Sequence, residues 1–227
     1  MANGVKAVFF DLDNTLIDFL TMKRRSCEAA VDAMICAGVP LKKEEALASL
    51  YFIYKRVGMD DRKVFQRFLS KHVGRIDERI LAAGIVAYRR ERVKHYDPYP
   101  HTIPVLQRLR KSGFRLGIIT DAPRLKAWMR LHAARLASLF DTVVTYEDTF
   151  RRKPAKQPFE AALDKLHLDP SDCVMVGDWP HRDIIGAKRM GMRTIFARYG
   201  NPDHPNPGAD FSVNTMIELE KTIRSLK

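Results

Sequence analysis

The stretch VFFDLDNTLI, residues 8–17, runs a short apolar segment directly into two carboxylates, Asp11 and Asp13. The apolar residues are rich in Val and Phe and do not alternate with polar ones, which predicts a strand buried on both faces of a parallel sheet. Two acids so close together repel each other, and desolvation adds to the cost of ionising them. Either these carboxylates lie in a solvated turn, or a positive group binds beside them.

The second half of the chain shows the pattern expected of the rest of such a sheet. Helical patterns cover 101–111, 123–137, 156–167 and 182–190, and apolar strand patterns cover 114–119, 141–145, 173–176 and 193–197. Strands that alternate with helices indicate parallel βαβ units. We therefore predict an α/β fold with a doubly wound, Rossmann-like parallel sheet.

The segment between the first two strands has a different texture. Amphipathic patterns of helical length follow one another at 22–37, 42–56, 62–72 and 77–95, and no convincing strand occurs among them. The Asp97-Pro98-Tyr99-Pro100 turn ends this segment. We predict an all-helical domain at residues 18–97, inserted into a core formed by residues 1–17 and 98–227.

The composition narrows the class of protein. The formal net charge is +12, but the basic residues are scattered and do not interleave with aromatic residues as in a single-strand nucleic-acid binder. The charge therefore suits an anionic small substrate. The N-terminus does not resemble a signal peptide, no apolar run is long enough to span a bilayer, and the three cysteines form no CxxC pair. We expect a cytoplasmic protein, and the scarcity of glutamine suggests a thermophilic source.

The polar residues that follow the predicted strands are the candidates for chemistry. In an open α/β sheet, ligands bind just beyond the carboxyl ends of the strands. The residues at these ends are Asp11, Asp13, Thr120, Lys153, Asp178 and Asp183. Carboxylates are the ligands of Mg²⁺, which commonly also holds a substrate phosphate, and a hydroxyl and an ammonium group suit phosphate oxygens. The pattern predicts a site for a divalent cation and an anion.

These residues form four motifs in a recognisable order. The segments DLDNT at 11–15, Thr120, Lys153-Pro154 and GDWPHRD at 177–183 resemble the four motifs of the haloacid dehalogenase-like hydrolase superfamily. The inserted domain is similar to the helical cap of the subfamily that carries its cap between the first and second motifs. The Thr-Asp pair after the second strand and the stretch GDWPHRDIIGAKRMGM resemble an archaeal-type phosphatase branch.

The resemblance implies a catalytic role for each matched residue. Asp11 would be the nucleophile that takes the phosphoryl group. Asp13 would be the general acid for the leaving alcohol and then the base for water. Thr120 would hydrogen-bond the phosphoryl oxygens, and Lys153 would neutralise their charge together with that of Asp11.

The resemblance also implies a bound Mg²⁺. Its ligands would be Asp11, the main-chain carbonyl of Asp13, and Asp178. Asp183 would bind the metal directly or through a water.

Two positions depart from the pattern or leave a choice. Asp121 follows Thr120, where many relatives have Asn or a small residue, and we interpret it as a cap for the helix that begins near Pro123. Lys156 is a second candidate for the motif lysine, although Lys153-Pro154 matches better.

The function predicted is Mg²⁺-dependent hydrolysis of a small organic phosphate monoester, such as phosphoglycolate or a triose phosphate, through an aspartyl-phosphate on Asp11. Family members that dehalogenate carbon lack the acid at the position of Asp13, which opposes a 2-haloacid dehalogenase. That activity stays open as an alternative, as do a non-catalytic basic nucleic-acid-binding protein on a hydrolase scaffold and a phosphoryl-switched regulator. The expected partner is a small phosphorylated substrate, with no membrane and no nucleic acid, and the oligomeric state is not readable.

Overall fold

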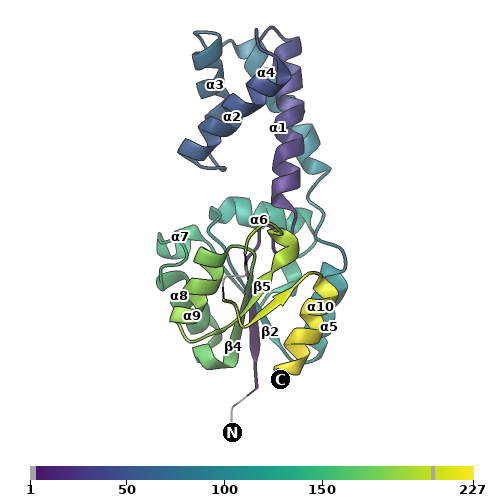
Figure 1. The fold of residues 1–227 in the computed structure, drawn as a ribbon, viewed down its shortest axis with the longest axis vertical. Helices are drawn as coiled ribbons and strands as arrows, with labels where there is room; N and C mark the ends of the chain where they lie inside the picture. Colours follow the sequence, from purple (N-terminus) through teal and green to yellow (C-terminus); the bar gives the residue numbers. More distant parts are fainter. Residues whose placement is uncertain (1–3, 206–207) are drawn as a thin grey trace. The chain divides into compact units, whose positions relative to one another are not determined.

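The computed structural model describes residues 4–205 and 208–227. The chain divides into two compact units, one that runs to Asp18 and resumes at Asp97–Lys227, and one formed by Phe19–Tyr96 (Figure 1). The chain leaves the first unit and returns to it at neighbouring points, because Ile17 and Pro98 form an antiparallel bridge. The sequence placed the inserted domain at 18–97, one residue longer at each end.

The first unit is built on a parallel sheet, which confirms the predicted α/β class. Its strands in the described residues are β1 (Ala7–Phe10), β2 (Arg115–Ile119), β3 (Thr142–Val144), β4 (Cys173–Gly177), β5 (Arg193–Ala197) and β6 (Phe211–Val213). Their order across the sheet is β3-β2-β1-β4-β5-β6, and every neighbouring pair is parallel. The order reverses direction between β1 and β4, so these two strands lie at the centre of the sheet.

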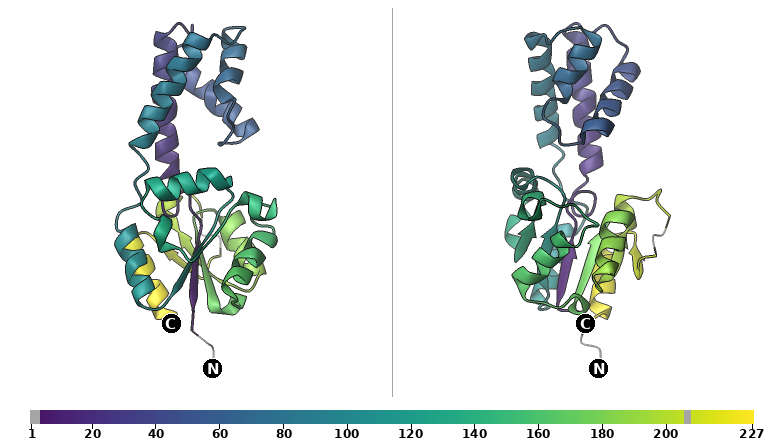
Figure 2. Two further views of the ribbon diagram at one scale, coloured as in Figure 1. Left: turned by 180° about the vertical axis from the view of Figure 1, so that it is seen from behind. Right: turned by 90° about the vertical axis from the view of Figure 1, so that its left-hand side faces the viewer.

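Helices cover both faces of the sheet, as Figure 2 shows. The helices α5 (Thr102–Lys111), α6 (Arg124–Ala133) and α10 (Met216–Ser225) contribute to the core on one face, and α8 (Gln157–Leu166) and α9 (Ile185–Arg189) to the core on the other. The side chains of β1 alternate between these two cores: Val8 and Phe10 join the first, and Ala7 and Phe9 the second. This double burial explains why β1 has no polar residue before Asp11.

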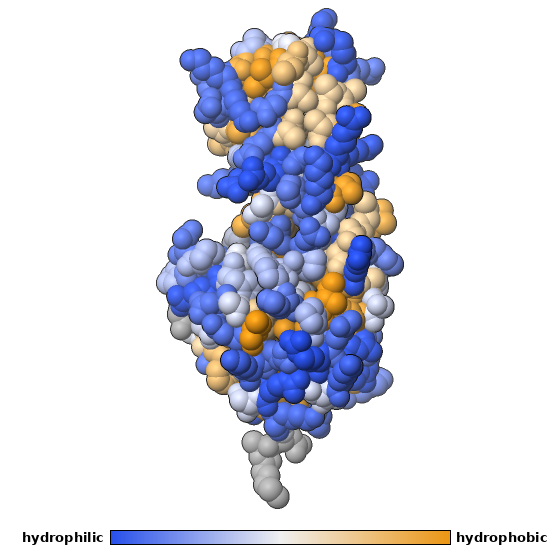
Figure 3. All heavy atoms as spheres, turned by 90° about the vertical axis from the view of Figure 1, so that its right-hand side faces the viewer, coloured by the Kyte–Doolittle hydropathy of each residue, from blue (hydrophilic) through white to orange (hydrophobic). Residues whose placement is uncertain are grey.

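The second unit is helical and has a core of its own. It contains α1 (Phe19–Cys36), α2 (Lys43–Val57), α3 (Val64–His72) and α4 (Glu78–Val93). Its fully buried side chains include Met34, Leu50, Phe68 and Leu69. Among the described residues, no helix has both the length and the apolar character needed to cross a bilayer. Figure 3 shows one face of the molecule, on which hydrophilic residues predominate and hydrophobic ones gather in patches.

Four elements differ from the sequence predictions. The sheet ends in β6, followed by α10, and neither was predicted; β6 is short and two of its three residues are exposed, so it lacks the apolar signal of a strand. The helix expected at 182–190 begins instead as a π turn, Pro180–Ile184, before α9. The helix expected at 123–137 ends at Ala133, and a short 3₁₀ turn, Ala137–Leu139, follows it.

Replacement of Phe9 by Ala should lower the free energy of unfolding by about 3–5 kcal/mol, because its side chain is fully buried in the core between the sheet and the helices α8 and α9. Urea denaturation measures this change. The matched control is Phe52→Ala on α2, whose residue is 55% exposed and should cost no more than about 0.5 kcal/mol. Equal losses for the two variants would contradict the assigned core.

Candidate active site

The candidate site begins where β1 and β4 end side by side. Parallel pairing sets Phe10 opposite Val176, and the Asp11 amide donates to the Val176 carbonyl at 2.9 Å. Asp11 and Asp178 are therefore the first residues beyond two adjacent strands. They lie at the point where the strand order reverses, which is where doubly wound sheets bind ligands.

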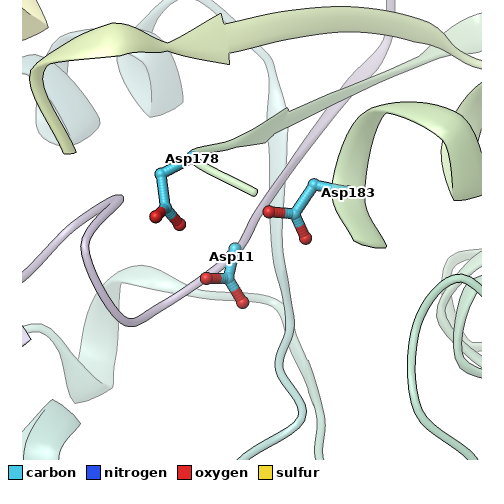
Figure 4. A group of neighbouring side chains, drawn as sticks. All are labelled: Asp11, Asp178 and Asp183. Carbon is cyan, nitrogen blue, oxygen red and sulfur yellow. The ribbon is translucent and has the colours of Figure 1, made fainter. Parts of the chain in front are cut away.

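Three carboxylates meet at this point. Asp11, Asp178 and Asp183 each offer an oxygen, and these oxygens lie within 4.8 Å of one another (Figure 4). The π turn brings Asp183 back to the strand end, where its Oδ2 accepts from the Trp179 amide at 2.9 Å. Gly177 makes this approach possible, since a Cβ at that position would lie 2.3 Å from Asp183 Cγ.

Lys153 is the cation of the cluster. Its Nζ donates to Asp11 Oδ1 and to Asp183 Oδ1, both at 2.6 Å, and to the Ile119 carbonyl at 2.7 Å. The residue is only 4% exposed. Lys156, the other lysine that the sequence offered, is a surface residue whose Nζ contacts Glu160. The structure thus brings only the first of the two lysines to the carboxylates.

Burial and mutual repulsion perturb these groups strongly. Burial raises the pKa of Asp11 to about 7, although Lys153 opposes the shift. Burial and the neighbouring charge of Asp11 raise the pKa of Asp178 to about 9. Burial by itself lowers the pKa of Lys153, but Asp11 and Asp183 outweigh it and raise that pKa. One ammonium group does not balance three buried carboxylates, so an oxygen-preferring divalent cation fits the donor set.

Asp13 lies beyond a tight turn and pairs with a different cation. The turn is closed at Asn14, which has a φ of 60°, a conformation that Asn tolerates better than most residues. Asp13 Oδ2 accepts from Arg130 Nη1 at 2.5 Å, and Arg130 is 4% exposed on α6. Sequence reasoning missed Arg130, because it resembles any other basic residue on an amphipathic helix.

The end of β2 supplies the hydroxyl. Thr120 is buried, its amide donates to the Val144 carbonyl, and its Oγ1 accepts from the Ala122 amide at 3.2 Å. The hydroxyl proton is still available to a ligand, as the role predicted for Thr120 requires.

The interpretation of Asp121 as a helix cap was wrong. The first amide of α6, that of Arg124, donates to Glu147 Oε2 at 2.7 Å, and the N-cap residue Pro123 offers no side-chain acceptor. Asp121 accepts instead from the amide of Lys153.

A segment beyond β5 supports both acidic loops and was missed by sequence reasoning. Asn201 Nδ2 donates to the Asp178 carbonyl at 3.1 Å, and the Tyr199 hydroxyl donates to the Thr15 carbonyl at 2.8 Å. Gly200 packs so closely that a Cβ would lie 1.7 Å from the Asn14 carbonyl oxygen. The rule that strand ends carry the site, applied to the fifth strand as well, would have found these residues.

The family follows from comparison with known proteins. The profile of the haloacid dehalogenase-like hydrolase family matches residues 8–197. The chain belongs to this family. The match includes Asp11, Lys153, Asp178 and Asp183, and so every residue of the cluster.

Similar proteins extend the match to nearly the whole chain. A glyceraldehyde 3-phosphate phosphatase of Methanocaldococcus jannaschii is 34% identical over 98% of this chain and 99% of its own length. The pyrophosphatase PpaX of Bacillus velezensis is 32% identical over 84% of this chain and 82% of its own. A crystal structure of a phosphatase of this family from Thermococcus onnurineus superposes with a TM-score of 0.72 at 27% identity, covering 96% of this chain and 98% of that one.

Without metal, the free energy of unfolding should fall as the pH rises above 3.8, the ordinary pKa of an aspartate, and the fall should end at about pH 7 for Asp11 and at about pH 9 for Asp178. Both values lie above the ordinary 3.8 of an aspartate, so the folded protein binds more protons than the unfolded chain, and raising the pH favours unfolding. Chemical denaturation across this pH range, with EDTA and with Mg²⁺, measures the effect.

Added Mg²⁺ should remove most of this fall, because a divalent cation held by these oxygens would stabilise the ionised carboxylates. In the absence of metal, Asp178→Asn should reduce the fall in the free energy of unfolding between about pH 7 and about pH 9. The same pH dependence in the wild type and in this variant would show that Asp178 does not titrate as described.

Proposed function

We propose that this chain is a Mg²⁺-dependent phosphatase that hydrolyses a small organic phosphate monoester through an aspartyl-phosphate on Asp11. The observation that carries the proposal is the cluster in which Asp11, two further carboxylates and the buried Lys153 meet at the end of β1. Its relatives named as phosphatases support the same reaction class.

The metal proposed is Mg²⁺, and Asp11, Asp178, Asp183 and the main-chain carbonyl of Asp13 would hold it. A hard cation suits an all-oxygen donor set, and its charge would oppose the burial and the repulsion that raise the pKa of Asp178. When bound, it supplies positive charge to the phosphoryl oxygens.

In the first step, a carboxylate oxygen of Asp11 attacks phosphorus and the bond from phosphorus to the ester oxygen breaks. Asp13 gives its proton to the leaving alkoxide, so a neutral alcohol departs. The positive charge of Lys153, which is hydrogen-bonded to Asp11, offsets the negative charge of Asp11 and the phosphoryl group. Thr120 donates its hydroxyl proton to a phosphoryl oxygen. These contacts stabilise the charge that develops in the transition state.

In the second step, Asp13 acts as a base. Its carboxylate takes a proton from a water molecule, whose oxygen attacks phosphorus, and the bond between phosphorus and Asp11 breaks. The products are inorganic phosphate and the regenerated Asp11 carboxylate. The Arg130 guanidinium, which donates to Asp13 Oδ2, orients the carboxylate that serves both steps.

A three-carbon phosphate is the first substrate to test. The Methanocaldococcus jannaschii relative, named for glyceraldehyde 3-phosphate, is similar over almost the entire chain. The similarity to the pyrophosphatase PpaX makes pyrophosphate the second compound to test, since pyrophosphate, like a phosphate monoester, has a terminal phosphoryl group.

Asp13 distinguishes this proposal from a 2-haloacid dehalogenase. Halide is a stable leaving group and needs no proton, whereas an alkoxide does, so an acid two residues after the nucleophile serves phosphate esters. A non-catalytic nucleic-acid-binding role finds no support in the site, where each catalytic residue is present and buried or paired.

The wild-type protein with Mg²⁺ should release phosphate from glyceraldehyde 3-phosphate or another small monoester, and EDTA should abolish the release. Asp11→Asn should lower kcat by more than about a thousandfold, because the amide is a poor nucleophile. Phosphate release measures both, and Lys156→Met is the matched control, since that lysine lies outside the cluster. A folded wild-type protein that releases no phosphate from any tested monoester, with any divalent metal, would overturn the proposal.

Asp13→Ala should slow the hydrolysis of an alkyl phosphate by about 10²- to 10⁴-fold, because the leaving alkoxide then receives no proton. An aryl phosphate with an acidic phenol needs less assistance, so its first step should suffer less. Burst kinetics separates that step from hydrolysis of the aspartyl-phosphate. Equal losses for the two esters in the first step would argue against Asp13 as the general acid.

A further inference from the structure

Asp121 is a charged residue beside the site that the proposed chemistry does not use. Its side chain is only 13% exposed, and it directly follows Thr120 at the end of β2. A carboxylate there is unfavourable for an anionic substrate unless it is engaged elsewhere. The structure shows that it is engaged with the loops that follow the neighbouring strands.

Its two oxygens have different partners. Asp121 Oδ1 accepts from the main-chain amide of Lys153 at 2.9 Å. Asp121 Oδ2 lies 3.5 Å from Arg182 Nη1, too long for a strong hydrogen bond but close enough for an ion pair. The Asp121 carboxylate thus connects three segments: the carboxyl end of β2, the loop after β3 that carries Lys153, and the π turn after β4 that carries Arg182.

The contact to Lys153 fixes that residue at its main chain. The other end of the side chain, Nζ, bonds Asp11, Asp183 and the Ile119 carbonyl. A lysine side chain has many rotamers, and ordering it costs conformational entropy. Fixing the main-chain nitrogen of Lys153 limits the positions that the ammonium group can reach. It therefore reduces the conformational entropy that is lost when the side chain binds the carboxylates.

We propose that Asp121 is a positioning residue for phosphoryl transfer: its Oδ1 fixes the Lys153 main chain so that the ammonium group lies between Asp11 and Asp183. The inference rests on the proposed phosphatase function and adds a residue to it. Asp121 acts through Lys153 and does not itself contact the reacting atoms.

Two variants separate the position of the acceptor from its charge. Asp121→Asn keeps an oxygen at the same distance from the backbone and removes the charge. Asp121→Glu keeps the charge and moves the acceptor by one methylene. Positioning predicts a mild effect for Asn and a severe one for Glu, and an electrostatic role predicts the reverse.

The expected result is a split between kcat and KM. Asp121→Glu should lower kcat by about 10- to 100-fold, because displacement of a positioned group by a fraction of an ångström is costly. Its KM should change little, and its affinity for orthovanadate, a transition-state mimic, should fall with kcat. Asp121→Asn and Arg182→Met should each retain kcat within about threefold, since both keep the acceptor for the Lys153 amide.

Asp141 provides a matched control, because its carboxylate also accepts from a main-chain amide, at the other end of β2. Asp141 Oδ2 accepts from the Leu116 amide at 2.8 Å, a main-chain contact like that of Asp121 but at the amino end of β2. Asp141→Glu should lower the melting temperature without lowering kcat. It separates loss of a structural hydrogen bond from loss of a positioned lysine.

The outcomes are distinct. Full activity in Asp121→Glu, or equal damage in Asp121→Asn, overturns the inference while an active wild type leaves the proposed function intact. A wild-type protein without phosphatase activity overturns the proposed function and this inference with it. Retained activity in Asp121→Asn, together with loss of kcat and of orthovanadate affinity in Asp121→Glu, establishes the positioning role.

Discussion

The buried ammonium group of Lys153, held between Asp11 and Asp183, is the interaction on which the site depends. Taking charges out of water is costly, and a buried ion pair repays that cost only when its hydrogen bonds are nearly complete. Lys153 meets this condition, since its Nζ has three acceptors within 2.7 Å. The carboxylates are not compensated to the same degree. Burial raises the pKa values of Asp11 and Asp178, which means that the site disfavours their ionised forms. The cluster is therefore short of positive charge, and the divalent cation that we propose would supply it.

The fold creates this crowding through the order of its strands. The reversal between β1 and β4 sets Asp11 and Asp178 at adjacent strand ends, and the π turn returns Asp183 to them. Close packing holds the acidic loops together from outside, since Gly177 and Gly200 leave no room for a Cβ. The apolar cores on both faces of the sheet stabilise the fold and so offset the unfavourable free energy of the acidic cluster.

Membership of the haloacid dehalogenase-like hydrolase family joins these features to a reaction class. The family name covers different leaving groups, so the reaction depends on residues beyond the nucleophile. In this chain Asp13 is present and its carboxylate is oriented by Arg130, which suits the departure of an alcohol. Asp11 and Asp13 pair with separate cations, Lys153 and Arg130, so each carboxylate has its own environment, as the proposed roles of nucleophile and acid require.

The sequence by itself determined the α/β class and the positions of most helices and strands, because a strand buried on both faces is continuously apolar and an amphipathic helix is periodic. It also located the acids and the lysine, since strand ends are recognisable and parallel strands bring them to one edge. Only the tertiary structure decided which groups pair: Arg130 with Asp13, Asp121 with the amide of Lys153, and Asn201 with the carbonyl of Asp178. Such pairs join residues far apart in the chain, and their distances depend on packing and loop conformation, which leave no local pattern in the sequence.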